Sequence, residues 1–317
     1  MKKQIISFLL FILPLCALAQ QEQMYTQFMF NKLLYNPGYA GSFVSPTLTA
    51  IYRSQWMGLD GAPKAMLLSY TQPLLNNRVG IGGNISRQSI GISTNLTFEV
   101  AYAYRVQLKR GTLAVGLQAS MRNIRQNWAD QRIVAIDQND PSIPTDPKSK
   151  FVPNFGAGVY YNAYNERWYA GIALPRIVSN SIDFAEFGDV LSREVQHINA
   201  MGGIQLEATE ELKVTPQVLL RYAIGAPFDA ELNVSALLQG KFYGGLSYRV
   251  GGDTNFAGES VDAALGFQAI DKLFICLSYD IGLTRLRKFH NGSLEATVRW
   301  WFNPPDDVVP VKPARPF

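Results

Sequence analysis

Alternation of side-chain character is strictest in the sequence NLTFEVAYAYRVQL, which runs from Asn95 to Leu108 and decides the fold class. Successive side chains of a β-strand point to opposite faces, so residues two apart share a face. One face of this segment is entirely apolar, while the other is small, polar or charged. The apolar face comprises Leu96, Phe98, Val100, Tyr102, Tyr104, Val106 and Leu108. The segment therefore predicts a strand that separates an apolar environment from a polar one.

The same two-faced pattern recurs along most of the chain, and charged residues often stand in the middle of the polar face. Read coarsely, the sequence predicts about fourteen antiparallel strands, an even number as in single-chain bacterial barrels. The expected segments are 46–56, 63–73, 78–88, 94–108, 111–125, 152–163, 167–175, 195–207, 211–224, 230–240, 241–250, 259–269, 272–283 and 292–302.

Short and long connections alternate from the middle of the chain onward. Outer-membrane barrels have short turns on the periplasmic rim and longer loops on the outer rim. A soluble β-sandwich is the alternative, but it does not require mid-strand charges on every face opposite the apolar one. We therefore expect an all-β, transmembrane antiparallel outer-membrane β-barrel over residues 46–302, surrounded by outer-membrane lipid in a bacterial cell. The tight turns are expected at Lys109-Arg110, Asn165-Glu166, Thr209-Glu210, Gln239-Gly240 and Asp271, and the loops at 126–151, 176–194, 251–258 and 284–291.

The first twenty residues have the composition of a secretory signal peptide. Lys2 and Lys3 precede an apolar run, and Ala17-Leu18-Ala19 supplies the small residues of a cleavage site. Residues 1–20 are therefore excluded from the expected fold. A lipoprotein is the alternative, but Leu15 stands before Cys16, where lipidation requires a small residue.

The composition of the remaining chain narrows the function classes. The whole sequence has 29 basic and 25 acidic residues, and loss of Lys2 and Lys3 leaves a net charge of about +2. That balance gives no support for nucleic-acid binding. Beyond the leader no apolar run approaches the roughly 18 residues of a membrane helix, so a membrane span must be made of strands. Only Cys276 remains, so no internal disulfide is possible.

Two regions fall outside the strand pattern. Residues 21–45 contain an amphipathic stretch of helical length, Met24 to Leu34, followed by Asn36-Pro37-Gly38. This segment is expected to form either a plug in the barrel or a periplasmic foot. Residues 303–317 contain five prolines and are expected to form a short extended tail.

The charged residues on the polar strand faces would all point into one lumen. Because both signs are present, they either pair and fill the interior or line a polar path for a solute. Their near balance favours pairing. The expected lumen-lining residues are Arg53, Glu99, Arg105, Arg122, Arg221, Arg249, Asp280 and Glu295, together with Glu231 and Arg299.

No group of residues in the sequence has the spacing of an enzyme active site. His197 and His290 are the only histidines, and neither has a cysteine or carboxylate at ligand spacing. A zinc site or a catalytic triad is therefore not expected. We expect no cofactor, no metal and no catalytic residue.

Two blocks of sequence carry a resemblance to a known family. The first is Gln27-Phe28-Met29-Phe30-Asn31-Lys32-Leu33-Leu34-Tyr35-Asn36-Pro37-Gly38-Tyr39-Ala40-Gly41-Ser42, and the second is Tyr52-Arg53-Ser54-Gln55-Trp56-Met57-Gly58-Leu59-Asp60-Gly61-Ala62-Pro63. Both resemble the PorP/SprF family of outer-membrane proteins of the Bacteroidetes, which is associated with type IX secretion and gliding motility. Tyr279-Asp280-Ile281 and Asn291-Gly292-Ser293-Leu294-Glu295 resemble its closing strands.

The resemblance implies a non-enzymatic barrel that works with type IX secretion components or with one exported surface protein, which it binds or anchors by its C-terminal signal domain. A passive pore or transporter for small solutes is the main alternative, and a membrane-embedded hydrolase is a third. Turn chemistry alone also accounts for the proline and glycine residues of the two segments expected to contact a partner. Those residues are Asn36, Pro37, Gly38, Tyr39, Gly41, Trp56, Asp60, Gly61 and Pro63.

Overall fold

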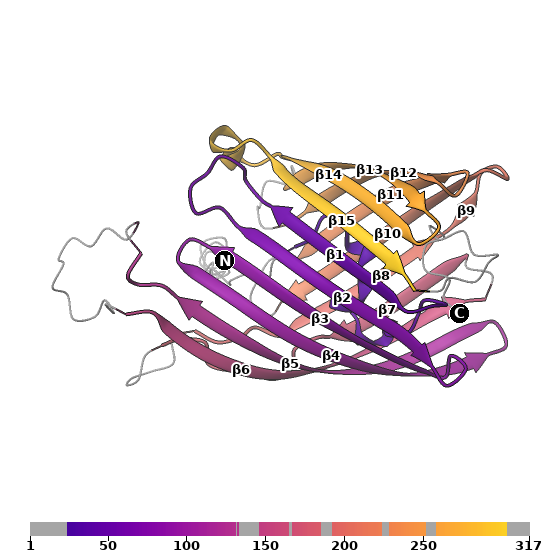
Figure 1. Ribbon diagram of the computed structural model, residues 1–317, viewed down its shortest axis with the longest axis horizontal. Coiled ribbons are helices and arrows are strands. Elements are labelled where there is room, and N and C mark those ends of the chain that lie inside the picture. Colours follow the sequence, from indigo (N-terminus) through magenta and orange to yellow (C-terminus); the bar gives the residue numbers. More distant parts are fainter. Residues whose placement is uncertain are drawn as a thin grey trace, which may run out of the picture.

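The computed structural model is a closed antiparallel β-barrel of fourteen strands (Figure 1). It describes residues 24–130, 132, 146–164, 167–184, 192–223, 228–251 and 258–302. Sequential strands pair in order, β15 pairs with β1, and β10 pairs with β11 to complete the ring. The short β9 continues β8 beyond Gln205, and both pair with β10, so the two are counted as one strand of the barrel. The strands are β1 Thr47–Ser54, β2 Lys64–Leu74, β3 Val79–Ile90, β4 Ser93–Leu108, β5 Gly111–Gln126, β6 Lys148–Ala163, β7 Trp168–Leu174, β8 His197–Ile204, β9 Leu206–Glu207, β10 Leu212–Ala223, β11 Asp229–Leu238, β12 Phe242–Val250, β13 Ser260–Ile270, β14 Leu273–Gly282 and β15 Ser293–Trp301.

The predicted fold class is confirmed, and β4 shows why. Its outward side chains are the apolar ones of the alternating segment, with Val100 65% exposed on the barrel surface. On its inward face Thr97, Glu99, Ala103 and Arg105 are buried. An outer band of exposed apolar residues around buried polar ones is the arrangement of a barrel that sits in lipid. No helix in the described part of the chain has the length and apolar character needed to cross a membrane.

The two rims of the barrel differ in connection length, as the sequence predicts. Tight connections such as 109–110, 239–241 and 271–272 share the rim at which β1 begins, which we call the turn rim. Longer connections, such as those between β1 and β2 and between β14 and β15, share the opposite rim, which we call the loop rim. By the usual arrangement of outer-membrane barrels, the turn rim faces the periplasm.

The wall of the barrel is uneven in height. Strands β4, β5 and β6 each have 16 residues, whereas β12 and β15 have nine. At about 3.3 Å per residue, the difference corresponds to roughly 20 Å of strand. Figure 1 shows that β4, β5 and β6 reach farther at the loop rim than the shorter strands on the other side of the barrel.

Residues 24–45, which we call the N-terminal segment, lie inside the barrel. The amphipathic stretch Met24–Leu34 is not one continuous helix, because the segment forms three separate 3-10 turns: η1 (Phe28–Phe30), η2 (Lys32–Leu34) and η3 (Pro37–Tyr39). Asn31 and Asn36 separate the turns with backbone angles outside the helical region. These breaks change the chain direction, so successive side chains reach different walls of the interior.

Close approach of this segment to the wall requires glycine on the facing strands. A Cβ atom at Gly80 of β3 would overlap the backbone of Ala40, and one at Gly116 of β5 would overlap the backbone of Pro37 and Gly38. These strand glycines therefore make room for the N-terminal segment, at some cost in strand stability. The signal peptide and the proline-rich tail expected from the sequence lie outside the described residues.

Candidate functional site

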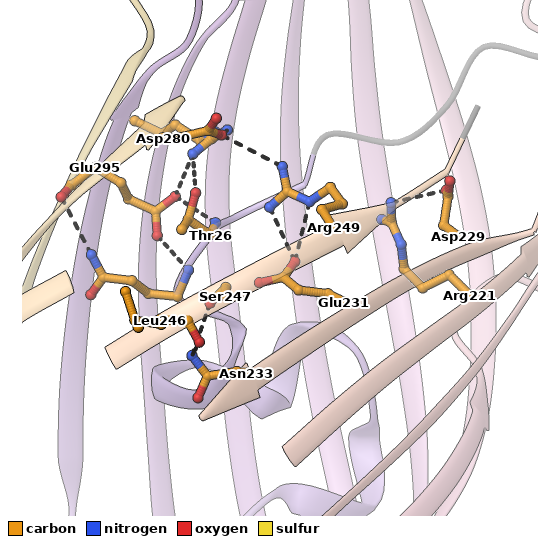
Figure 2. A network of polar contacts seen from close by, with 12 residues as sticks. Thr26, Arg221, Asp229, Glu231, Asn233, Leu246, Ser247, Arg249, Asp280 and Glu295 are labelled. Carbon is orange, nitrogen blue, oxygen red and sulfur yellow. Dashed lines mark hydrogen bonds and ion pairs between the residues drawn. The ribbon is translucent and has the colours of Figure 1, made fainter. Parts of the chain in front are cut away.

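A network of buried ionic and hydrogen-bonding groups lies in the half of the barrel nearer the loop rim (Figure 2). Glu295 of β15 is fully buried, and its two carboxylate oxygens accept the backbone N–H groups of Thr26 and Gln27, each at 2.9 Å. The Gln27 side-chain amide donates to Ser278 Oγ of β14 at 2.9 Å. The barrel wall thus holds the start of the N-terminal segment by hydrogen bonds from both strands.

Three arginines connect the strands around this network. Arg53 of β1 reaches across β15, with its Nη2 atom 2.9 Å from Asp280 Oδ2 and its Nη1 atom 3.4 Å from Glu295 Oε2, and it also donates to Thr26 Oγ1. Arg249 lies 3.1 Å from Glu231 and 3.7 Å from Asp280. Arg221 and Asp229 form a third pair at 3.4 Å. Figure 2 shows this pair beside Arg249 and Glu231.

Carboxylates outnumber guanidinium groups in this network. Asp262 of β13, which lies directly opposite Asp280 of β14, is 1% exposed. Neither of its carboxylate oxygens has a hydrogen-bond partner among the described residues. The buried acids of the network are Asp229, Glu231, Asp262, Asp280 and Glu295, against its three arginines Arg53, Arg221 and Arg249.

The other lumen residues expected from the sequence also point inward. Glu99 accepts a hydrogen bond from Asn84 at 2.9 Å, and Arg122 lies 3.3 Å from Glu194. Arg105 donates to the N-terminal segment, at Ser42 Oγ over 2.9 Å and at the Ala40 carbonyl over 3.4 Å. The charged side chains are therefore arranged as internal contacts.

Apolar packing completes the filling of the interior by the N-terminal segment. Phe30 packs on Phe274 of β14, with ring centroids 5.0 Å apart. On the opposite wall, Tyr39 meets Tyr160 of β6 edge-on at 5.3 Å. The segment therefore contacts both sides of the barrel and occupies the space between them.

The first group of residues expected to contact a partner lies in this packed interior. Asn36 is fully buried and donates from its side-chain amide to the Val159 carbonyl at 3.0 Å, and Gly41 donates its backbone N–H to Thr71 Oγ1 at 2.7 Å. Pro37, Gly38 and Tyr39 are buried as well. In this arrangement these residues have no surface to offer a partner, because the barrel wall already binds their polar groups. Contact through them stays a prediction for a state in which the segment has left the interior.

The second expected group lies elsewhere, at the loop rim. The connection between β1 and β2 is docked on the connection between β14 and β15, with the Met57 N–H donating to the Gly292 carbonyl at 2.8 Å. Trp56 is half-buried beside His290, Pro63 is buried, and the Asp60 side chain is 87% exposed. Gly61 has a positive φ angle of 71° and accepts a hydrogen bond from Gly91 of the β3–β4 turn.

The comparison with known proteins settles the family. The sequence matches the family described as "Type IX secretion system membrane protein PorP/SprF" over residues 17–300. The chain belongs to the PorP/SprF family. A PorP/SprF protein with this fold is a type IX secretion membrane protein of the outer membrane. No curated protein matches the sequence.

The barrel of this PorP/SprF protein is similar to other outer-membrane barrels of known structure. The toluene transporter TbuX of Ralstonia pickettii superposes with a TM-score of 0.51 at 10% identity, covering 87% of this chain and 93% of that one. The monoaromatic hydrocarbon channel CymD gives a TM-score of 0.51 at 10% identity, covering 89% and 94%. At this level of identity the likeness concerns the fold alone.

One structured part of the PorP/SprF loop rim was not expected from the sequence. The described parts of the connection between β7 and β8, residues 175–184 and 192–196, are held by Asn154 of β6. The Asn154 amide group donates to the Val178 carbonyl and to Glu194 Oε2, both at 2.7 Å, and its carbonyl oxygen accepts the Ile177 N–H at 3.1 Å. In the sequence, only the position of Asn154 on the inward face of a strand near a long loop could have indicated this contact. The strand pattern does not distinguish Asn154 from the other polar residues that face the lumen.

His290 of this PorP/SprF protein has a structural role in the β14–β15 connection. His290 is buried, and its Nδ1 atom accepts the Gly292 N–H at 2.9 Å. Within the described ranges, no three or more His, Cys, Asp and Glu side chains are grouped to hold a metal ion.

Proposed function

We propose that this PorP/SprF protein is a non-enzymatic component of type IX secretion that binds an exported surface protein through the C-terminal signal domain of that protein. The observation that carries the proposal is the filled interior. Because the N-terminal segment packs on both walls and is hydrogen-bonded to them, the part of the lumen formed by the described residues offers no wide path for a solute. This favours a role for the loop rim in binding another protein.

The loop rim has the features of a protein-binding surface. The β1–β2 connection is fixed by its hydrogen bonds to the β14–β15 connection, so its tip is presented in a defined position. Leu59 is 38% exposed beside the exposed Asp60. The tall strands β4 to β6 rise on one side of this rim and would flank a bound domain. A prearranged surface reduces the ordering cost of binding.

The test is an affinity pull-down of the tagged protein from gently solubilised outer membranes, followed by mass spectrometry, with a porin as the background control. The variant Leu59→Asp with Asp60→Lys changes the tip of the β1–β2 connection. The matched control is Leu75→Asp on the turn rim, where Leu75 is 73% exposed and has a positive φ angle.

We expect the unaltered protein and Leu75→Asp to retain surface proteins with a C-terminal signal domain or type IX components, and the loop-rim variant to lose them. If the loop-rim variant and Leu75→Asp recover equal amounts of these partner proteins, the partner does not bind at the tip of the β1–β2 connection. Recovery of nothing above the porin, combined with steady conductance of the purified protein in a planar bilayer, would favour the passive pore instead.

A further inference from the structure

Two buried cations of the N-terminal segment and β15 have no buried acid beside them. Lys32 and Arg299 are each 4% exposed, and no carboxylate of the described residues lies within 4.0 Å of either one. The buried acids that pair with Arg53, Arg221 and Arg249 all stand in the half of the barrel nearer the loop rim. The interior is therefore divided by charge, with carboxylates in excess near the loop rim and cations in excess near the turn rim.

Both cations line one cavity of about 40 Å³ between the N-terminal segment and the wall. The cavity also has aromatic walls, formed by Phe30, Tyr243, Phe274 and Trp301. Tyr243 and Trp301 stand at the turn-rim ends of β12 and β15, so the cavity is nearest to the periplasmic rim. A buried water occupies about 10–15 Å³ by this kind of measure, so the space matches about three waters or one small ligand.

The partners of the two cations differ. Arg299 donates to the Phe30 carbonyl and, over 3.2 Å, to Thr49 Oγ1. The Lys32 ammonium lies 3.5 Å from the centroid of the Tyr169 ring, and no described residue accepts a hydrogen bond from it. An ammonium has three donors, and leaving them unsatisfied in a buried site is costly. Burial and the nearby Arg299 charge lower the pKa of Lys32 to about 7.

We propose that this cavity binds a small carboxylate group between Lys32 and Arg299, with its apolar end against the aromatic walls. A carboxylate accepts hydrogen bonds from both cations and neutralises part of their charge. The volume admits a carboxylate group with one or two further carbon atoms, either as a free short acid or as the end of a longer chain that reaches in from the turn rim. The site is distinct from the loop rim assigned to the exported partner.

The experiment is a calorimetric titration of the full mature chain in a non-ionic detergent with sodium propionate. Propionamide, which has the same shape and no charge, is the ligand control, and hexanoate tests for a longer chain. Lys32→Met removes the cation with little change in length. Lys109→Met removes an exposed cation from the β4–β5 turn on the same rim and is the matched control.

We expect propionate to bind the unaltered protein and Lys109→Met with equal affinity, at least tenfold more tightly than Lys32→Met. Binding should be tighter at pH 6, where Lys32 is charged, than at pH 8.5. Tighter binding of hexanoate than propionate identifies the carboxylate as the head of a longer chain, and weaker binding identifies a free short acid. Equal binding of propionate and propionamide, equal affinity of Lys32→Met, or no heat at pH 6 would each overturn the proposal.

Discussion

Arg53 and Asp280 are joined by an ion pair of 2.9 Å that crosses β15 and ties β1 to β14, the two neighbours of the last strand. The Arg53 side chain is 1% exposed, and the Asp280 side chain is 7% exposed. Removing one partner of a buried pair leaves an uncompensated charge, which costs about 3–5 kcal/mol. We therefore expect Arg53→Met to lower the free energy of unfolding by about that amount, measured by urea titration in lipid vesicles.

The matched control for this prediction is Lys213→Met. Lys213 lies 3.9 Å from Glu207, and these two side chains are 26% and 70% exposed. Such surface pairs contribute about 0–1 kcal/mol. If the two variants lose equal stability, the buried network around Arg53 does not stabilise the barrel in the way its geometry indicates.

Glu295 holds the start of the N-terminal segment through two backbone hydrogen bonds. In Glu295→Gln one oxygen is replaced by an NH₂ group, which faces an N–H donor and has no acceptor there. We expect faster hydrogen exchange at Thr26 and Gln27, by about tenfold for a loss of roughly 1.4 kcal/mol. The exposed Glu211→Gln on the turn rim should leave the exchange of these amides unchanged.

Gly80 provides the space into which Ala40 fits. Gly80→Ala would bring a Cβ atom against the Ala40 backbone, so we expect the segment to be displaced while the barrel persists. Limited proteolysis between residues 24 and 45 should become at least tenfold faster, with heat-modifiable migration on gels retained. Gly244→Ala is the control, because a Cβ atom at Gly244 meets nothing within 4 Å. Protection of the segment in Gly80→Ala equal to that in the control would show that the close approach is not required.

The pKa of Lys32 is lowered to about 7 by burial, so stability should depend on pH. Between about pH 7 and pH 10 the unfolded lysine is protonated while the folded one is neutral, so unfolding takes up a proton. By linkage, the free energy of unfolding then rises with pH across this range and changes little from this group below pH 7. Lys32→Met should flatten the rise in urea titrations at pH 7, 8 and 9. An equal slope in the variant would assign the pH dependence to other groups.

The sequence predicts the barrel closely because strand alternation has a period of two residues. In β4 the face assigned to each residue from Thr97 to Val106 agrees with the structure, since a shift by one would expose Glu99 and Arg105 to lipid. All fourteen expected segments overlap observed strands. The inward direction of Arg53 and Asp280 follows from the same rule.

The sequence does not predict what these inward residues contact. Glu295 binds the backbone of Thr26, which is 269 positions away, and local pattern carries no information on that distance. The same holds for the pair of cations at Lys32 and Arg299, one on the N-terminal segment and one on the last strand. Tertiary contacts also override the amphipathic pattern of Met24–Leu34, because a segment surrounded by walls on all sides gains nothing from a single apolar face.

The filled interior predicts a barrel that does not conduct. The N-terminal segment packs between Tyr160 on one wall and Phe274 on the other, so we expect the purified protein to be electrically quiet in a planar bilayer. Removal of residues 24–45 should open the lumen and give steady conductance, provided that the variant still shows heat-modifiable migration. In that variant, Arg105→Gln should reduce anion preference, because Arg105 would then face the open lumen. If the unaltered protein conducts as well as the truncated one, the N-terminal segment does not close the pore.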